Sequence, residues 1–268
     1  MVRLEAEREF ARIYDVLQYN GKLTSPRGAK TLEVENFTYT LAPYVRFNPF
    51  LVRNLNINYI KRELAWYIKA DNTDMSIVEY AKAWGPMVKD GILNSCYGTY
   101  WFKNKTGVHD VLLMLTQDPD SRRAVIPMYG TDPAHHDKDV RDVPCTTSVE
   151  FRIRNGRLNA RFVMRSQDAV LGMGNDVPAF SFLQEVVARL LGIELGWLTV
   201  SVGSFHVYER HFEMVNAMSS QNADAREFAP MPLLTLHDAL CISHCQIPIT
   251  SAFAQWLLVA PEAPVKSD

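Results

Sequence analysis

The 268-residue sequence contains no apolar run that approaches the ~20 residues needed to span a membrane. Its formal net charge of −2 excludes a whole-protein electric field that would attract nucleic acid or an anionic membrane. An anionic ligand would therefore need a local cluster of Arg or Lys. Four cysteines do not make a disulfide scaffold in a chain of this length. The low cysteine content indicates a reducing, cytosolic setting in which a single thiol is free for chemistry.

The sequence also lacks internal repeats and low-complexity linkers, so we expect one domain over residues 1–268. The charged N-terminus, MVRLEAEREFARIYDVL, is typical of an amphipathic helix and not of a signal peptide. The last ~50 residues contain scattered prolines and no sustained hydrophobic period, so no structure is assigned to them.

Two segments carry the period of an amphipathic helix. Ile60, Leu64 and Ile68 recur at i, i+4 and i+8 in INYIKRELAWYIKA. The same period runs through FLQEVVARLLG, where Gly192 is placed to cap the helix C-terminus. Between these segments most signals are of strand. The sequence therefore predicts an α+β fold with a mixed sheet.

The strand signal is clearest in CTTSVEFRIRNGRLNARFVMRS. Asn155-Gly156 separates two runs of alternating apolar and polar residues, which is the strongest short-range signal of a β-hairpin. If the turn has two residues and no bulge intervenes, the register places Cys145 opposite Ser166. The hairpin alone would then bring Cys145 to the Arg165-Ser166 pair.

The segment MRSQDAVLGMGNDVPAF, residues 164–180, is too polar for pure core and too rich in glycine for one continuous helix. We expect a loop-like run. Taken alone, Asp176 would be read as a turn or N-cap residue ahead of the following helix.

Cys145 follows a proline at the start of the first hairpin strand. A thiol beside fixed positive charge ionises more readily, and the thiolate is the nucleophile. The alternative is a small buried hydrophobe, which is the usual state of a free cysteine and is our interpretation of Cys96.

No metal site is predicted. Cys241 and Cys245, with His244 between them, lack a second pair of ligands at zinc spacing. The HHDKD run at 135–139 is interpreted as a solvated loop.

Three arginines are candidates for binding an anion. Arg122-Arg123 follows the turn composition QDPDS and precedes the strand-like AVIPMY, and Arg27 lies in the flexible TSPRGAKT. Guanidinium groups suit bidentate contacts to phosphate. Solvated surface charge is the alternative for all three.

From about Arg27 to His211, over about two thirds of its length, the chain resembles the thymidylate synthase superfamily. Six ordered blocks carry the resemblance, namely RELAWY, NSCYG, QDPDSRRAVI, DVPCTTSVEF, MRSQDAVLG and GSFHVYERH. It implies a mixed sheet flanked by helices and a homodimer formed through the sheet. No match is seen after about Asn216. In the family the C-terminal residues close over bound folate, and the sequence does not indicate whether PEAPVKSD does so.

The resemblance implies that Cys145 is the nucleophile that adds to C6 of a pyrimidine nucleotide. The implied phosphate ligands are Arg27, Arg165 and Ser166 of the same chain, with Arg122 and Arg123 reaching across the dimer. Addition of a thiolate turns C5 of the base into a nucleophile, so a cysteine and a general base are needed together.

The resemblance also implies 5,10-methylenetetrahydrofolate as co-substrate, with no metal. Glu63 would organise water and proton transfer, Trp84 would pack the pterin side, and Tyr97 would join the proton-transfer network. The other implied binding residues are Asp168 for the base or the folate, and His206 and Tyr208 for the sugar hydroxyl.

Two departures from the thymidylate synthase pattern point to one branch. Cys145 is followed by Thr146, where those enzymes have His. Counting from the Leu-Gly pair of MRSQDAVLG, the place of their Asn holds Asp176, and Asn175 is out of register by one. Both features resemble phage deoxycytidylate and related cytidylate hydroxymethylases.

The exchange of Asn for Asp bears on the base. A carboxyl group that shares a proton with N3 of cytosine matches the N3 acceptor and the N4 amino donor. Against uracil a carboxylate would face O4 without a proton to offer, leaving a buried pair unsatisfied at a cost of ~1–3 kcal/mol or more. The Asp176 side chain therefore favours cytosine.

The predicted activity is 5-hydroxymethylation of dCMP or CMP, with water capturing the methylene and tetrahydrofolate released. Three alternatives stay open: a cytidylate methyltransferase that releases dihydrofolate, a uracil-specific thymidylate synthase or hydroxymethylase, and a non-catalytic nucleotide- or RNA-binding protein. The presence of Cys145, Glu63 and Tyr97 together argues against the last, since a pure binder has no use for a nucleophile. Ribose and deoxyribose are not distinguished.

Overall fold

The computed structural model describes residues 2–219, 223–225 and 228–258. Within them the strands form a six-stranded sheet in the order β1-β2-β6-β5-β4-β3. The strands are β1 Lys22–Thr24, β2 Thr31–Leu41, β3 Val125–Pro127, β4 Thr146–Arg154, β5 Arg157–Asp168 and β6 Glu194–Tyr208. The β5–β6 pair is parallel and the other pairs are antiparallel, so the predicted mixed sheet is confirmed.

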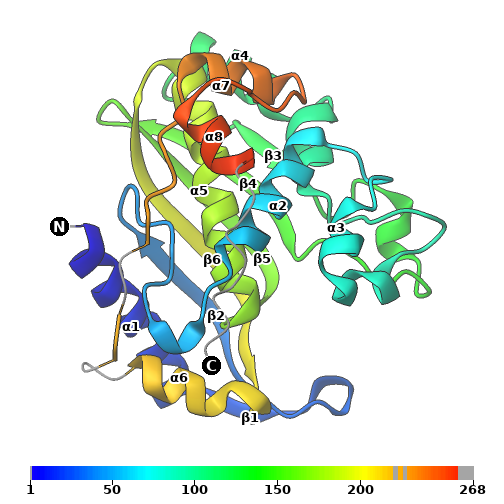
Figure 1. The fold of residues 1–268 in the computed structure, drawn as a ribbon, viewed down its shortest axis with the longest axis vertical. Coiled ribbons are helices and arrows are strands. Elements are labelled where there is room, and N and C mark those ends of the chain that lie inside the picture. Colours follow the sequence, from blue (N-terminus) through cyan, green and yellow to red (C-terminus); the bar gives the residue numbers. More distant parts are fainter. Residues whose placement is uncertain (1, 220–222, 226–227, 259–268) are drawn as a thin grey trace.

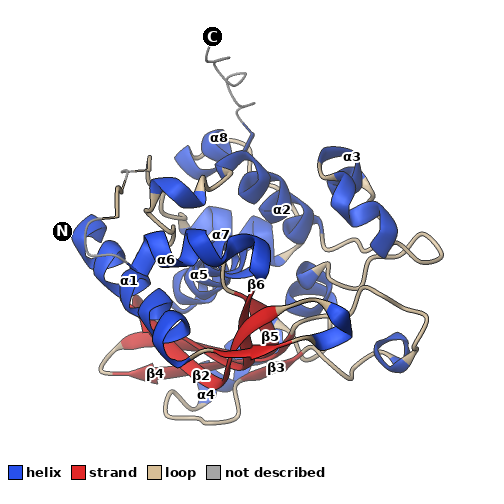
Figure 2. Ribbon diagram, turned by 90° about the horizontal axis from the view of Figure 1, so that it is seen from below, coloured by secondary structure: helices blue, strands red, loops and turns tan. Residues whose placement is uncertain are grey.

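The helices gather mainly on one face of this sheet (Figures 1 and 2). They are α1 Val2–Asn20, α2 Ile57–Lys69, α3 Ser76–Tyr80, α4 Val108–Gln117, α5 Leu171–Leu191, α6 Phe212–Ser219, α7 Leu236–Ser243 and α8 Ala252–Leu258. Helix α5 packs on the sheet, where Phe180 stacks on Phe162 of β5 with ring centroids 3.9 Å apart. The α+β fold is confirmed, and so are the predicted helices at the N-terminus, at INYIKRELAWYIKA and at FLQEVVARLLG.

Helix α2 has the buried face that its sequence predicts, and α5 ends at the predicted glycine. Ile60, Leu64 and Ile68 form the buried face of α2, and Asn56 caps its N-terminus by accepting from Tyr59 N–H. Gly192 ends α5 with φ 68°, in the left-handed region that glycine adopts without steric cost.

The expectation of a loop over residues 164–180 was wrong. The segment is divided between the end of β5 and the start of α5, which runs without a break from Leu171. The residue that caps the turn is Asp168, whose Oδ1 accepts from Val170 N–H and Leu171 N–H at 2.7 and 2.8 Å. Asp176 is inside α5, so its interpretation as an N-cap was also wrong.

Glycine in this helix reflects close packing and not a bend in the chain. A Cβ at Gly174 would lie 2.6 Å from Nη2 of Arg53, whose guanidinium Nε donates to the Val170 carbonyl at 2.6 Å. A larger residue at this position would push Arg53 away from the start of α5. The glycine content of the segment therefore has a tertiary cause, which sequence composition does not reveal.

The predicted hairpin is confirmed, with a two-residue turn and Ser148 opposite Val163. A bulge between Thr146 and Ser148 then shifts the register by one residue. Arg165 N–H donates to the Cys145 carbonyl at 2.9 Å. Cys145 therefore lies opposite Arg165, and the expectation that it lies opposite Ser166 was wrong by the one residue that the bulge inserts.

The interpretation of residues 135–139 as a solvated loop was wrong for His135, which is buried. Its Nδ1 accepts from Gly130 N–H at 2.9 Å, and its Nε2 lies 2.9 Å from the hydroxyl of Tyr100. Tyr100 in turn donates to the Asn94 carbonyl at 3.0 Å. Both ring nitrogens of His135 are therefore used in hydrogen bonds within the fold, which indicates a structural role.

The segment without an assigned structure contains α7 and α8. It is tied to α5 by Glu185, which accepts from Leu234 N–H at 3.0 Å and pairs with Arg46 at 2.5 Å in a buried ion pair. The residues PEAPVKSD, 261–268, lie outside the described residues. No helix in the described part of the chain is both long enough and apolar enough to cross a membrane.

The most constrained backbone approach in the fold is at Gly98, beside the π-helical turn Thr99–Lys103. A Cβ at Gly98 would lie 1.7 Å from the carbonyl oxygen of Tyr67 in α2. The neighbouring Tyr97 stacks on Tyr67 with ring centroids 5.4 Å apart. Any side chain at this position would therefore collide with the backbone of Tyr67, and the two segments would have to move apart.

Gly98→Ala should therefore lower the free energy of unfolding by about 3 kcal/mol, because overpacking against backbone cannot be relieved by a rotamer change. Chemical denaturation measures the loss. The matched control is Gly85→Ala, whose added Cβ meets only Cγ1 of Val78 at 3.9 Å, an ordinary contact. Equal stability of the two variants would show that the approach of Gly98 to α2 is not a constraint.

Candidate active site

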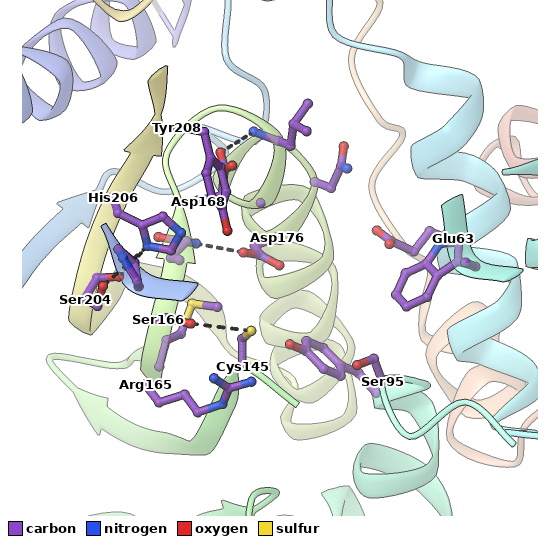
Figure 3. A pocket seen from close by; sticks show the side chains of 18 of the residues that line it. Glu63, Ser95, Cys145, Arg165, Ser166, Asp168, Asp176, Ser204, His206 and Tyr208 are labelled. Atoms are coloured by element: carbon purple, nitrogen blue, oxygen red, sulfur yellow. Dashed lines mark hydrogen bonds between the residues drawn. The ribbon is translucent and has the colours of Figure 1, made fainter. Parts of the chain in front are cut away.

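A cavity of about 560 Å³ lies between the sheet and the helices α2 and α5, and Figure 3 shows the side chains that line it. Its size is in the range of ligand sites. Ten of the thirteen side chains predicted from the sequence line this cavity: Glu63, Trp84, Tyr97, Cys145, Arg165, Ser166, Asp168, Asp176, His206 and Tyr208. They come from distant segments, which the fold alone brings together.

Cys145 lies just before β4 with its side chain half-buried. The Ser166 hydroxyl donates to its Sγ at 3.8 Å. Arg165 lies beside it and donates through Nε and Nη2 to the carbonyls of Pro144 and Val143. Burial raises the pKa of the Cys145 thiol, whereas the Arg165 charge and the Ser166 hydrogen bond lower it. In the single chain burial outweighs the cation, so the expected easier ionisation is not seen.

The carboxyl of Asp176 is held by a short relay of hydrogen bonds. Tyr39 donates to Oε1 of the buried Gln167 at 3.0 Å, and Gln167 Nε2 donates to Oδ2 of Asp176 at 2.9 Å. Burial raises the pKa of Asp176 to about 7, the Gln167 bond opposes this rise, and the charge of Asp168 adds to it. Because Oδ2 accepts from an amide, a proton on this carboxyl belongs on Oδ1.

Glu63 projects from α2 on the opposite wall of the cavity (Figure 3). It is buried and accepts from the Tyr59 hydroxyl at 2.8 Å. Burial raises its pKa to about 8, hydrogen bonds from Tyr59 and Tyr67 lower it, and the charge of Asp176 raises it. The cavity thus contains two acids that can each hold a proton near neutral pH.

Tyr97 connects the cavity to the strand that carries the nucleophile. Its hydroxyl oxygen lies 3.4 Å from Thr146 N and 3.3 Å from Thr146 Oγ1, both of which can donate to it. Burial raises the pKa of Tyr97 well above its usual value. Thr146 therefore contacts a predicted member of the proton-transfer network.

Asp168, His206 and Tyr208 line the far end of the cavity (Figure 3). The Asp168 carboxylate caps α5, and His206 Nδ1 lies 3.2 Å from the Ser204 carbonyl. If Nδ1–H donates there, Nε2 of His206 is left as an acceptor. Ser204 also donates to Glu33 of β2.

Arg122 and Arg123, two of the predicted arginine ligands, do not line the cavity of their own chain. Arg122 and Arg123 are exposed ahead of the edge strand β3. The backbone of Arg27 forms a 3-10 turn with Pro26, which does line the cavity, but the Arg27 side chain lies outside the description.

A second cavity of about 420 Å³ shares Tyr59, Trp84, Leu171 and Asn175 with the first. Its walls are largely aromatic and apolar, and Arg53 adds a cation. Such a wall fits a flat ring system that carries an anionic end.

Several lining residues were missed from the sequence, among them Tyr59, Tyr67, Gln167 and Glu33. Tyr59 and Tyr67 lie one turn before and after Glu63, so the helical period contained the signal that could have found them. Glu33 enters the site only because β2 pairs with β6, opposite His206. No local sequence pattern predicts the pairing of β2 with β6.

The described residues contain no group of three or more His, Cys, Asp or Glu side chains that could hold a metal ion. Cys241 lies 3.6 Å from His237 on α7, away from the cavity.

Comparison with known proteins agrees with this geometry. The family model described as thymidylate synthase matches residues 10–247. The chain belongs to the thymidylate synthase family. Its match extends past Asn216, so the expectation that the resemblance ends there was wrong. Members are folate-dependent enzymes that use methylenetetrahydrofolate, bind nucleoside monophosphates and are generally dimeric.

Three curated relatives are deoxycytidylate 5-hydroxymethyltransferases, from Enterobacteria phages T4, T2 and T6. Each is 34% identical to this chain over an alignment of 208 positions, and the match covers 70% of this chain and 80% of the relative.

The raised pKa of Asp176 has a consequence for stability. The folded state holds this proton more tightly than the unfolded chain, so stability is lost as pH rises from about 4 to about 7. Asp176→Asn should remove this loss. Its free energy of unfolding should match wild type near pH 4 and exceed it at pH 8 by roughly 2–4 kcal/mol.

Denaturant titrations at a series of pH values measure the difference. Asp139→Asn, at an exposed position, is the control and should follow the wild-type curve. A constant difference between Asp176→Asn and wild type from pH 4 to pH 8 would contradict the prediction.

Proposed function

We propose that this protein is a pyrimidine nucleotide 5-hydroxymethylase that converts dCMP, or CMP, to the 5-hydroxymethyl nucleotide. The observation that carries the proposal is the Asp176 carboxyl, which takes the place of the family's Asn and is held with Oδ1 free to carry a proton. The names of the phage relatives support the same substrate class.

Asp176 selects cytosine through the direction of its hydrogen bonds. The proton on Oδ1 can be donated to N3 of cytosine, while Oδ2 accepts from the N4 amino group. With uracil in the same position, its N3–H would face the proton on Oδ1, and its O4 would face Oδ2, which has no proton to give, so neither group would be satisfied. The proton given to N3 also offsets negative charge that develops in the ring during nucleophilic addition.

Cys145 is the nucleophile. Its Sγ forms a bond to C6, which moves the electrons of the C5=C6 bond to C5. Loss of the C5 proton and departure of Sγ later restore the double bond. Burial raises the thiol pKa in the single chain, so activation depends on added positive charge near Sγ. Arg165 supplies part of it, and the partner's guanidinium groups supply the rest.

The phosphate ligands are Arg27, Arg165 and Ser166 of one chain, with Arg122 and Arg123 donated across a homodimer. The exposure of Arg122 and Arg123 on an edge supports this assignment, since neither reaches the cavity of its own chain. His206 and Tyr208 bind a sugar hydroxyl, and Asp168 positions the base or the folate.

The dimer forms through the face of the sheet turned away from α5. That face carries polar pairs between β2 and β6, with Thr38 bonded to Ser201 and Thr40 to Thr199, and Arg161 of β5 donates to Ser201. The chain acts as one catalytic domain, because a single sheet takes strands from residue 22 to residue 208.

The co-substrate 5,10-methylenetetrahydrofolate supplies the one-carbon unit when it is bound. Trp84 and the aromatic walls of the second cavity hold its ring system. Glu63 would give a proton to the departing folate nitrogen and take one from the water whose oxygen becomes the new hydroxyl, with Tyr97 in the same network.

The test is an assay of dCMP, CMP and dUMP side by side with methylenetetrahydrofolate. We expect a cytidylate product heavier by one hydroxymethyl group by mass spectrometry, with no dihydrofolate signal at 340 nm. Cys145→Ser is the inactive control, and it should still bind nucleotide. Formation of dihydrofolate together with a methylated product would contradict this proposal and would show that the protein is a methyltransferase.

Asp176→Asn should move the preference from cytosine toward uracil. An amide can present its NH₂ group to O4 and its oxygen to N3–H, so we expect kcat/KM for dCMP to fall at least tenfold, about 1.4 kcal/mol, while that for dUMP rises. The ratio of the two kcat/KM values measures the change. An unchanged ratio would remove Asp176 from substrate selection.

A further inference from the structure

Tyr59 has no role in the proposed reaction described above, yet its hydroxyl lies between Glu63 and Trp84, which both have one. It projects from α2 one turn before Glu63. Its oxygen donates to Oε1 of Glu63 at 2.8 Å and accepts from Nε1 of Trp84 at 3.0 Å. Trp84 belongs to the separate 3-10 segment Lys82–Met87, so one hydroxyl joins two elements of the fold.

The direction of these two bonds is determined by their chemistry. An indole N–H can only donate, so the Tyr59 oxygen must accept from Trp84. The single proton of Tyr59 is then given to Glu63. Oε1 of Glu63 is thereby an acceptor, and a proton held by this carboxyl belongs on Oε2.

Tyr59 and Trp84 also line both cavities, whereas Glu63 lines only the larger one. A ring system packed against Trp84 from the smaller cavity would therefore touch the element to which Tyr59 is bonded. The Tyr59 hydroxyl joins that indole directly to the Glu63 carboxyl by two hydrogen bonds. The other described route is longer and runs through ring contacts, from Trp84 to Trp66 and on to Tyr67.

We propose that Tyr59 is a positioning residue, which orients the Glu63 carboxyl for proton and water handling and couples it to the folate-side wall at Trp84. The inference rests on the proposed function, because it assigns Tyr59 a role in the same reaction. Tyr59 does not touch the reacting atoms. It acts through Glu63.

The proposed role of Tyr59 predicts a change in the pH dependence of the reaction rate. The groups that face Glu63 are Tyr59 and Tyr67 on α2 and Asp176 on α5, with Tyr97 stacked on Tyr67. Burial raises the pKa of Glu63 to about 8, and the Tyr59 hydrogen bond lowers it. Loss of that bond must raise the Glu63 pKa further, so any limb of the rate profile that reports Glu63 moves to higher pH.

Tyr59→Phe is the test, because it removes the hydroxyl and keeps the ring. We expect kcat to fall about tenfold, since a hydrogen bond to an ionisable partner is lost, while KM for the nucleotide stays unchanged. The matched control is Tyr80→Phe. The Tyr80 ring lies 6.4 Å from that of Tyr59 and is 40% exposed, and we expect wild-type kinetics.

A double-mutant cycle separates a positioning role from a general loss of packing. In a Glu63→Gln background, Tyr59→Phe should cause no further loss of kcat, because Tyr59 acts through the carboxyl. Losses that multiply across the cycle, or a wild-type pH limb in Tyr59→Phe, would overturn the inference. Should Tyr59→Phe fold poorly by thermal unfolding, Trp84→Phe replaces it. That variant should raise KM for folate and move the pH limb upward, by less than loss of the hydroxyl would, because Tyr59 donates more weakly to Glu63 once it no longer accepts from the indole. An unchanged pH limb in Trp84→Phe would overturn the inference.

A direct titration distinguishes failure of this inference from failure of the proposed function. Infrared difference spectroscopy of the carboxyl band, with Glu63→Gln to assign it, reports the Glu63 pKa without any turnover. A higher pKa in Tyr59→Phe supports the role of Tyr59 even if no hydroxymethyl product forms. An active wild type with the same Glu63 pKa in both proteins would refute it.

Discussion

The cost of burying charge is the constraint on which the site depends. Asp176 and Glu63 face one cavity from two helices, and each loses the water that would stabilise its carboxylate. Among the described side chains, none forms an ion pair with either carboxyl. The protein supplies neutral donors instead, an amide from Gln167 and a phenol from Tyr59. Both acids therefore keep a proton near neutral pH, and each has one oxygen committed as an acceptor.

This arrangement requires a rigid support, which the sheet and the two helices provide. The parallel β5–β6 pair brings the end of β5 beside His206, while the hairpin partner β4 carries Cys145 to the same edge. Gly98 allows α2 to approach closely enough for Tyr97 to stack on Tyr67. Glu63 is thereby held across the cavity from Asp176. The proposed chemistry needs a nucleophile and two proton carriers at fixed separations, and these contacts determine the separations.

Much of this was accessible from the sequence because local patterns carried it. The helical period predicted α2 and α5. The Asn155-Gly156 pair predicted the hairpin and the strand register next to its turn. The ordered motifs predicted thirteen side chains of the site, and ten of these line one cavity. The errors have non-local causes. The bulge near Thr146, the burial of His135 and the helical course of the glycine-rich segment each depend on residues distant in the chain.

The sequence by itself determined which chemical groups are present, because cysteine, carboxyl and guanidinium side chains can be read directly and their spacing recognised. It also determined the α+β character, because period and turn residues are local properties. Only the tertiary structure decided that the backbone of Cys145 pairs with Arg165 and not with Ser166, since one inserted residue changes a register without changing a pattern. Only the tertiary structure decided that the pKa of Asp176 rises to about 7, because a pKa depends on the water that the surrounding fold excludes.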